Sequence, residues 1–135
     1  LFSAEGLQTL EGDRANLKKL YASGMRMAGM VHFFDNELAG SMHGIEKGGL
    51  TDFGRTIIRD MESMGMIVDI AHSSHATVAD ILQMAQRPVV SSHGGVDGCR
   101  FHRGGNPRGD GAECLAGDQG GTGAFVAKRC SSEDR

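Results

Sequence analysis

The chain is poor in aromatic residues, in proline and in cysteine. Its 135 residues include no tryptophan, one tyrosine, two prolines and three cysteines, and aromatic side chains make up 5% of the total. With a formal net charge of -3, the sequence offers neither a basic stripe nor a stacking platform, so we expect no nucleic-acid partner. The cysteines match no C-x-x-C pattern, and neither a cysteine metal site nor a disulfide-stapled secreted fold is predicted.

Long apolar runs are also lacking. No stretch approaches the roughly 20 residues that a membrane-spanning helix needs, and no charged-then-apolar leader opens the chain. We therefore expect a soluble enzyme of the cytoplasm or periplasm, without a transmembrane segment. The first residue is Leu1 rather than methionine, which predicts that sequence upstream of it is missing.

Up to about residue 98, short apolar runs alternate with segments of helical periodicity. The clearest helix opens near Thr51, carries Ile57, Ile58 and Met61 on one face, and ends at Gly65. Two further helices are predicted, one capped by Asp13 and one that starts from Ser74. The predicted strands are residues 1–4, 25–31, 66–71 and 88–92.

This alternation predicts an α/β fold. Near-continuous apolar strands separated by helices are typical of a parallel sheet with right-handed crossovers, as in a doubly wound sheet or a barrel. A complete (β/α)₈ TIM barrel needs about 250 residues, so this chain would be a fragment of one. The segment from Phe33 to Leu50 is too long for a plain connection and is a candidate substrate loop.

A polar residue that can bind a metal or hold a substrate follows each predicted strand. These residues are Glu5, His32, His72 and His93. The carboxyl ends of such strands meet at one face, so one carboxylate and three imidazoles are expected to converge there. Singly, each has a commoner structural explanation, such as a loop carboxylate or a histidine bonded to a backbone carbonyl. Four in succession favour a site.

The composition changes after Gly94. Eleven glycines fall between Gly94 and Gly123, with almost no apolar periodicity. Such a segment buries too little apolar surface to offset the entropy of ordering, so residues 104–135 are expected to be poorly ordered. A short strand over residues 123–127 is the one candidate element there. The glycine spacing does not match a phosphate-binding loop.

Three ordered motifs resemble those of the membrane (renal) dipeptidase family of zinc metallopeptidases. They run from Gly48 to Arg55, from Met64 to Ser74 and from Pro88 to His93, and further similarity surrounds Glu5 and His32. The resemblance implies a partial (β/α) barrel metallopeptidase domain over residues 1–98, covering roughly the third to sixth strands. Residues 99–135 would be a Gly-rich irregular tail, poorly ordered or out of family register, and a frame-shifted reading of the gene would explain it.

The resemblance also implies roles for individual residues. Glu5 is similar to the carboxylate that bridges two zinc ions, and His72 and His93 are similar to ligands of the second ion. His32 resembles a substrate-contacting histidine, and Arg103 is the nearest counterpart of an arginine that binds the substrate carboxylate. The implied activity is hydrolysis of dipeptides by a hydroxide that bridges two metal ions.

The chain departs from the family pattern in ways that bear on its own activity. The first-strand His-x-Asp pair has no counterpart, so one metal would keep a single protein ligand, and a late aspartate is also absent. The alternatives are an inactive fragment or a different amidohydrolase-type hydrolase, although no strand end offers the lysine that such enzymes commonly add. An unclosed sheet predicts that the isolated chain aggregates or forms a homodimer.

The remaining polar candidates have weaker assignments. Asp69, inside a predicted strand, could point into the barrel or hydrogen-bond a neighbouring metal ligand. Three other histidines are expected to be solvated: His43, His75 and His102.

Overall fold

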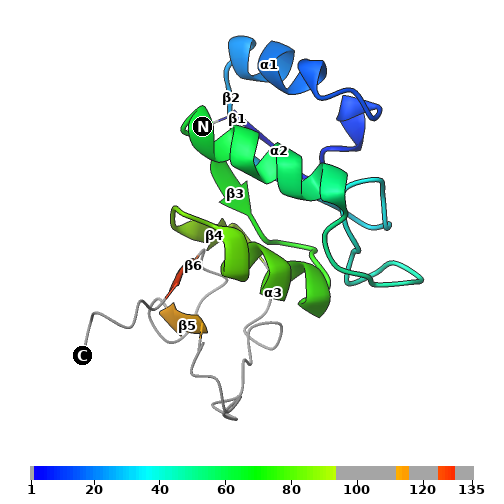
Figure 1. The fold of residues 1–135 in the computed structure, drawn as a ribbon, viewed down its shortest axis with the longest axis vertical. Coiled ribbons are helices and arrows are strands. Elements are labelled where there is room, and N and C mark those ends of the chain that lie inside the picture. The colour runs from blue at the N-terminus through cyan, green and yellow to red at the C-terminus, as the bar shows by residue number, and fades with distance from the viewer. Residues whose placement is uncertain (1, 94–111, 116–124, 130–135) are drawn as a thin grey trace.

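The computed structural model describes residues 2–93, 112–115 and 125–129, and Figure 1 shows the path of the chain. Helices and strands alternate through the first 91 residues, as the sequence predicts. The elements in chain order are β1 (Phe2–Ala4), the 3-10 helix η1 (Gln8–Leu10), α1 (Ala15–Ala22), β2 (Met25–Gly29), α2 (Asp52–Ser63), β3 (Ile67–Asp69), α3 (His75–Met84), β4 (Val89–Ser91), β5 (Ala112–Leu115) and β6 (Phe125–Arg129).

Side-chain caps fix where the helices begin. The Thr51 hydroxyl accepts a hydrogen bond from the Gly54 amide at the start of α2, and Ser74 accepts one from the Thr77 amide at the start of α3. These caps satisfy amides that have no partner within the helix. The predicted cap of α1 by Asp13 is not found: the N-cap residue is Arg14, without a side-chain cap, and the Asp13 carboxylate only accepts from the Ala15 amide at 2.8 Å.

The strands form one mixed sheet with the order β1-β2-β3-β4-β6-β5. The first four strands are parallel to one another and follow the chain order, which confirms the predicted α/β fold with parallel strands. β1 ends where predicted, at Ala4, whereas β2, β3 and β4 end one or two residues earlier than predicted, so Val31 and Ala71, for example, lie beyond the strands. No helix within the described ranges is long and apolar enough to cross a membrane.

The described part of the glycine-rich tail differs from the prediction of an irregular segment. Strand β6 overlaps the predicted strand over 123–127, but β5 lies where no element was predicted. Both correct the expectation of a purely parallel sheet, because β6 pairs antiparallel with β4 and with β5. Residues 94–111, 116–124 and 130–135 are outside the described residues.

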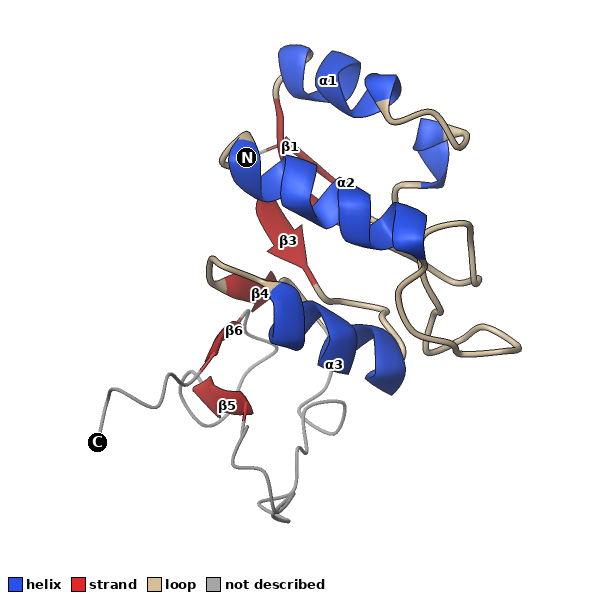
Figure 2. Cartoon of the chain, in the orientation of Figure 1, coloured by secondary structure: helices blue, strands red, loops and turns tan. Residues whose placement is uncertain are grey.

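One face of the parallel strands is covered by helices. Figure 2 shows α1, α2 and α3 on the same side of the sheet, which is what crossovers of one hand between successive parallel neighbours produce. Ala28, Val68 and Val89 face that side, and each is at most 2% exposed. Their strand neighbours Ile67 and Val90 point to the opposite face and are only partly buried. The core therefore lies between the sheet and the helices.

Candidate functional site

The four polar residues that follow the parallel strands meet at one edge of the sheet. Glu5 follows β1 directly, His32 and His72 lie three residues beyond β2 and β3, and His93 lies two residues beyond β4. Nε2 of His32 is 3.0 Å from Oε2 of Glu5, and Nε2 of His93 is 3.8 Å from Oε1 of Glu5. The Nε2 atoms of His72 and His93 are 2.8 Å apart.

The structure thus brings together four of the five residues predicted for the site. Ligand atoms from Glu5, His72 and His93 all lie within 4.8 Å of one another. The ring of His32 is 4.5 Å from that of His72, with the two rings nearly perpendicular. Arg103, the fifth residue, is outside the described residues.

A buried carboxylate ties the ends of β3 and β4 together beneath this cluster. Oδ1 of Asp69 accepts hydrogen bonds from the backbone amides of Ala71 and Ser92, each at 3.0 Å. These two amides immediately precede His72 and His93 along the chain. Asp69 therefore bonds the backbones that carry the two histidines, whereas the sequence left open a bond to a ligand or a place inside the barrel.

The donor set of the cluster is suited to a divalent metal ion. Two imidazole Nε2 atoms 2.8 Å apart share at most one proton between them, so at least one lone pair faces the other ring. Nδ1 of His72 is buried without a hydrogen-bond partner among the described residues, whereas Nδ1 of His93 meets the Ser92 hydroxyl at 2.8 Å. Two neutral imidazoles and a carboxylate are common zinc ligands.

The surroundings of His72 favour its neutral form. Burial lowers the pKa of the imidazole, and the nearby rings of His32 and His93 lower it further, while the Glu5 carboxylate opposes these effects. A lower pKa means that one ring nitrogen keeps its lone pair at neutral pH, which is the state that binds a metal.

The backbone of His72 adopts a conformation that side chains rarely take. Its φ of 62° lies in the left-handed region. This conformation costs a non-glycine residue about 1–3 kcal/mol and persists only where surrounding contacts hold it. The carbonyl oxygen of His72 accepts two hydrogen bonds, from the Met42 amide at 2.8 Å and from the Ser41 hydroxyl at 3.2 Å. The long segment between β2 and α2 thus supports the turn at His72.

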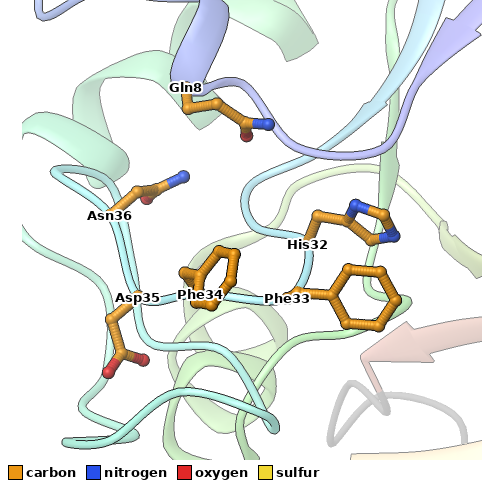
Figure 3. A pocket seen from close by; sticks show the side chains of 6 residues that line it. All are labelled: Gln8, His32, Phe33, Phe34, Asp35 and Asn36. Carbon is orange, nitrogen blue, oxygen red and sulfur yellow. The ribbon is translucent and has the colours of Figure 1, made fainter.

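This segment carries a pocket beside the cluster. The pocket has a volume of about 240 Å³ and is lined by Gln8, His32, Phe33, Phe34, Asp35 and Asn36 (Figure 3). Phe34 is 79% exposed there. His32 belongs both to the pocket and to the cluster, so a ligand in the pocket would lie next to the candidate metal ligands.

Two of the pocket residues are already used in shaping the loop. The Asp35 carboxylate accepts from the backbone amides of Ser41 and Glu46 at 2.7 and 2.9 Å, and these bonds lower the pKa of Asp35. The Asn36 side chain bonds three backbone groups within residues 30–39. Four lining groups are therefore left to meet a ligand, Gln8, His32, Phe33 and Phe34.

Sequence reasoning missed several residues around the cluster. His43 is exposed, as expected, but its ring lies 5.6 Å from that of His72, and Phe33 lies 5.5 Å from His43. Nothing in the periodicity of a long irregular loop marks these residues or Ser41. His75 is exposed at the start of α3, as expected, and His102 is outside the described residues.

The chain is similar in sequence to a known protein family and to several curated proteins. Residues 1–107 match the model of the membrane dipeptidase family, peptidase family M19. The chain is 37% identical over 95 residues to dipeptidase aclJ of Aspergillus oryzae, which covers 69% of this chain and 22% of that protein. It is 36% identical over 93 residues to an uncharacterized dipeptidase, C965.12, of Schizosaccharomyces pombe. This alignment covers 66% of this chain and 22% of that protein.

A third relative, dipeptidase verJ of Clonostachys rogersoniana, is 34% identical over 95 residues, with 69% of this chain and 24% of the relative covered. The chain therefore spans less than a quarter of the length of these curated relatives. The family match extends over most of the chain and includes all four clustered residues and Arg103. By this match, the chain belongs to the membrane dipeptidase family, peptidase family M19.

Proposed function

We propose that this chain is part of a metal-dependent dipeptidase and carries one side of its metal centre. Glu5, His72 and His93 would bind metal, and His32 and Arg103 would bind the dipeptide. The observation that carries the proposal is the approach of three ligand atoms to within 4.8 Å at the carboxyl ends of parallel strands. Membership of a dipeptidase family supports the same reaction.

Zinc ions held at the centre would supply a shared hydroxide for attack on the peptide carbonyl, without a serine or cysteine nucleophile. The two oxygens of Glu5 allow it to span two ions, while each histidine offers one nitrogen. The Ser92 hydroxyl would orient the His93 ring through Nδ1. His32, which contacts Glu5 and lines the pocket, would hold the substrate beside the centre.

We also propose that the four parallel strands are a segment of a (β/α)₈ TIM barrel. Their consecutive order, with helices on one side, supports this. Residues 1–98 would be the barrel portion and residues 99–135 a tail out of family register. The antiparallel pairing of β6 with β4 supports the second part, since a barrel would continue with a parallel strand. Translating the coding DNA in its other two frames after codon 98 tests it, and failure to recover a strand-like family sequence would contradict it.

By this proposal the chain alone is inactive, because the ligands of the other metal and part of the substrate pocket would come from outside it. The unpaired edge of β1 and the partly covered sheet face support dimerisation or aggregation of the isolated chain. A cooperatively melting monomer at micromolar concentration would contradict this part.

Metal titration of the chain tests the proposed site. We expect zinc or cobalt to bind, and His72→Ala and His93→Ala to weaken binding by more than the roughly 10–100-fold effect of supporting residues. His75→Ala is the matched control, because His75 is exposed and outside the cluster. Equal affinities for all four proteins would contradict the site. Chelator-sensitive dipeptide hydrolysis by the full reading frame would then test the activity.

A further inference from the structure

A buried hydroxyl joins the backbones of two histidines in the cluster. Ser41 is fully buried, and its Oγ lies 2.5 Å from the carbonyl oxygen of His32 and 3.2 Å from that of His72. A hydroxyl has one proton, so the two carbonyls share it. The same oxygen accepts from the backbone amide of His43 at 3.1 Å. One side chain therefore links the ends of β2 and β3 and the loop that carries His43.

The position of Ser41 is itself fixed on both sides. Its amide donates to Oδ1 of Asp35 at 2.7 Å, and it forms a β-bridge with Ser73. The next amide, of Met42, donates to the His72 carbonyl at 2.8 Å. With the hydroxyl bond, this gives the His72 carbonyl two donors, which hold the residue in its left-handed conformation.

We infer that Ser41 is a positioning residue, whose hydroxyl sets the turn at His72 and thereby directs the His72 imidazole toward His93. Without the hydroxyl, the His72 carbonyl keeps one donor and the His32 carbonyl loses its bond to this hydroxyl. The turn is then free to relax toward an ordinary backbone conformation, which rotates the imidazole. The consequence for metal binding rests on the proposed function, whereas the consequence for the backbone does not.

Thr77 provides a matched control for this inference. It is also a fully buried hydroxyl residue that anchors the same loop, with Oγ1 2.9 Å from the Gly40 carbonyl and 3.1 Å from that of Gly48. It bonds neither histidine. Thr77→Val thus loosens the loop and removes a bond to the Ser74 hydroxyl, but it leaves both donors to the His72 carbonyl in place, whereas Ser41→Ala removes one of them.

Hydrogen exchange without metal tests the backbone part. We expect Ser41→Ala to speed exchange of the Met42 amide at least about tenfold more than Thr77→Val does, because that amide bonds the His72 carbonyl. Equal acceleration in the two variants would reduce Ser41 to an ordinary loop anchor and overturn the inference. In the unmutated chain, the Met42 amide must exchange more slowly than it does in an unstructured peptide of the same local sequence, and an unprotected amide would also overturn the inference.

Cobalt binding tests the imidazole part. We expect Ser41→Ala to weaken cobalt affinity by about 10–100-fold and to change the visible spectrum of the bound ion. Thr77→Val is expected to keep the spectrum, and Ser41→Thr, which retains a hydroxyl, to restore it. An unchanged spectrum in Ser41→Ala would contradict the positioning role. If the unmutated chain binds no cobalt, the proposed metal site fails, and hydrogen exchange still decides the role of Ser41.

Discussion

Two connections leave the same edge of the sheet, and each carries a histidine three residues beyond its strand. The connection from β3 to α3, residues 70–74, is a tight turn that needs a left-handed residue, His72. The connection from β2 to α2, residues 30–51, winds around the side chains of Asp35 and Asn36 instead. The short connection is held from outside, by Ser41 and Met42 of the long connection, whereas the long connection is shaped largely by its own side chains.

The first test breaks the long connection where it packs on α2. A methyl group at Gly54 would collide with the carbonyl oxygen of Leu38, so Gly54→Ala must displace backbone. We expect it to lower the free energy of unfolding by about 3 kcal/mol, measured by urea denaturation. Gly48→Ala, in the long connection, is the control, because a methyl group there would have no heavy atom within 4 Å. A similar loss in both variants would show that the packing of α2 is not the cause.

The second test breaks the anchor of the short connection. Asp69→Ala removes the carboxylate oxygen that accepts hydrogen bonds from the backbone amides of Ala71 and Ser92, so both amides lose this acceptor. We expect a loss of about 2 kcal/mol in the free energy of unfolding. Asp52→Ala, at an exposed position in the first turn of α2, is the control and should cost about 0.5 kcal/mol. If Asp69→Ala costs no more, the short connection does not rely on this carboxylate.

Much of the short connection could be predicted from the sequence. Gly65 before β3 and Ser74 before α3 are local signals, and they placed the strand and helix to within a few residues. The position of His72 at a strand end followed from these. Its left-handed φ could not be predicted, because it depends on hydrogen bonds from Ser41 and Met42, 30 and more residues away.

The long connection shows the limit of sequence reasoning. Its length and polar composition predicted a substrate loop, and that role is still a prediction. Ser41, Asp35 and Asn36 have no periodic spacing, and their partners are backbone groups that any sequence provides. The meeting of Glu5 with the histidines was predicted from strand order alone, whereas the barrel and the metal roles remain proposals.

The third test uses pH to measure how the Asp35 carboxylate stabilises the long connection. Backbone amides of Ser41 and Glu46 hold the pKa of Asp35 below its usual 3.8. The folded state therefore binds the proton less readily than the unfolded state, and this contribution to stability is complete above about pH 4 and is lost as the pH falls through the folded pKa. We expect the stability difference between the unmutated chain and Asp35→Asn to shrink between pH 5 and pH 2. A constant difference would contradict it.

The smallest expected effect concerns the turn itself. Asparagine tolerates the left-handed region better than histidine does, so His72→Asn should cost nothing or raise the free energy of unfolding by about 0.5–1 kcal/mol. The same change should abolish metal binding at the proposed site. His75→Asn, in α3, is the control for a histidine of ordinary helical conformation. Marked destabilisation by His72→Asn alone would show that the imidazole, not the backbone, holds this turn.

The cap of α3 has a consequence for the order in which the chain folds. Besides capping the helix, the Ser74 hydroxyl donates to the Gly48 carbonyl at 2.7 Å, and the Ser74 amide donates to the Gly40 carbonyl at 3.0 Å. Residues 40 and 48 thus gain these partners only after a helix further along the chain has docked. In refolding followed by pulsed hydrogen exchange, the amides that donate across this contact, of Ser74 and Met42, should become protected after those of α2, as the late closure of a non-local loop.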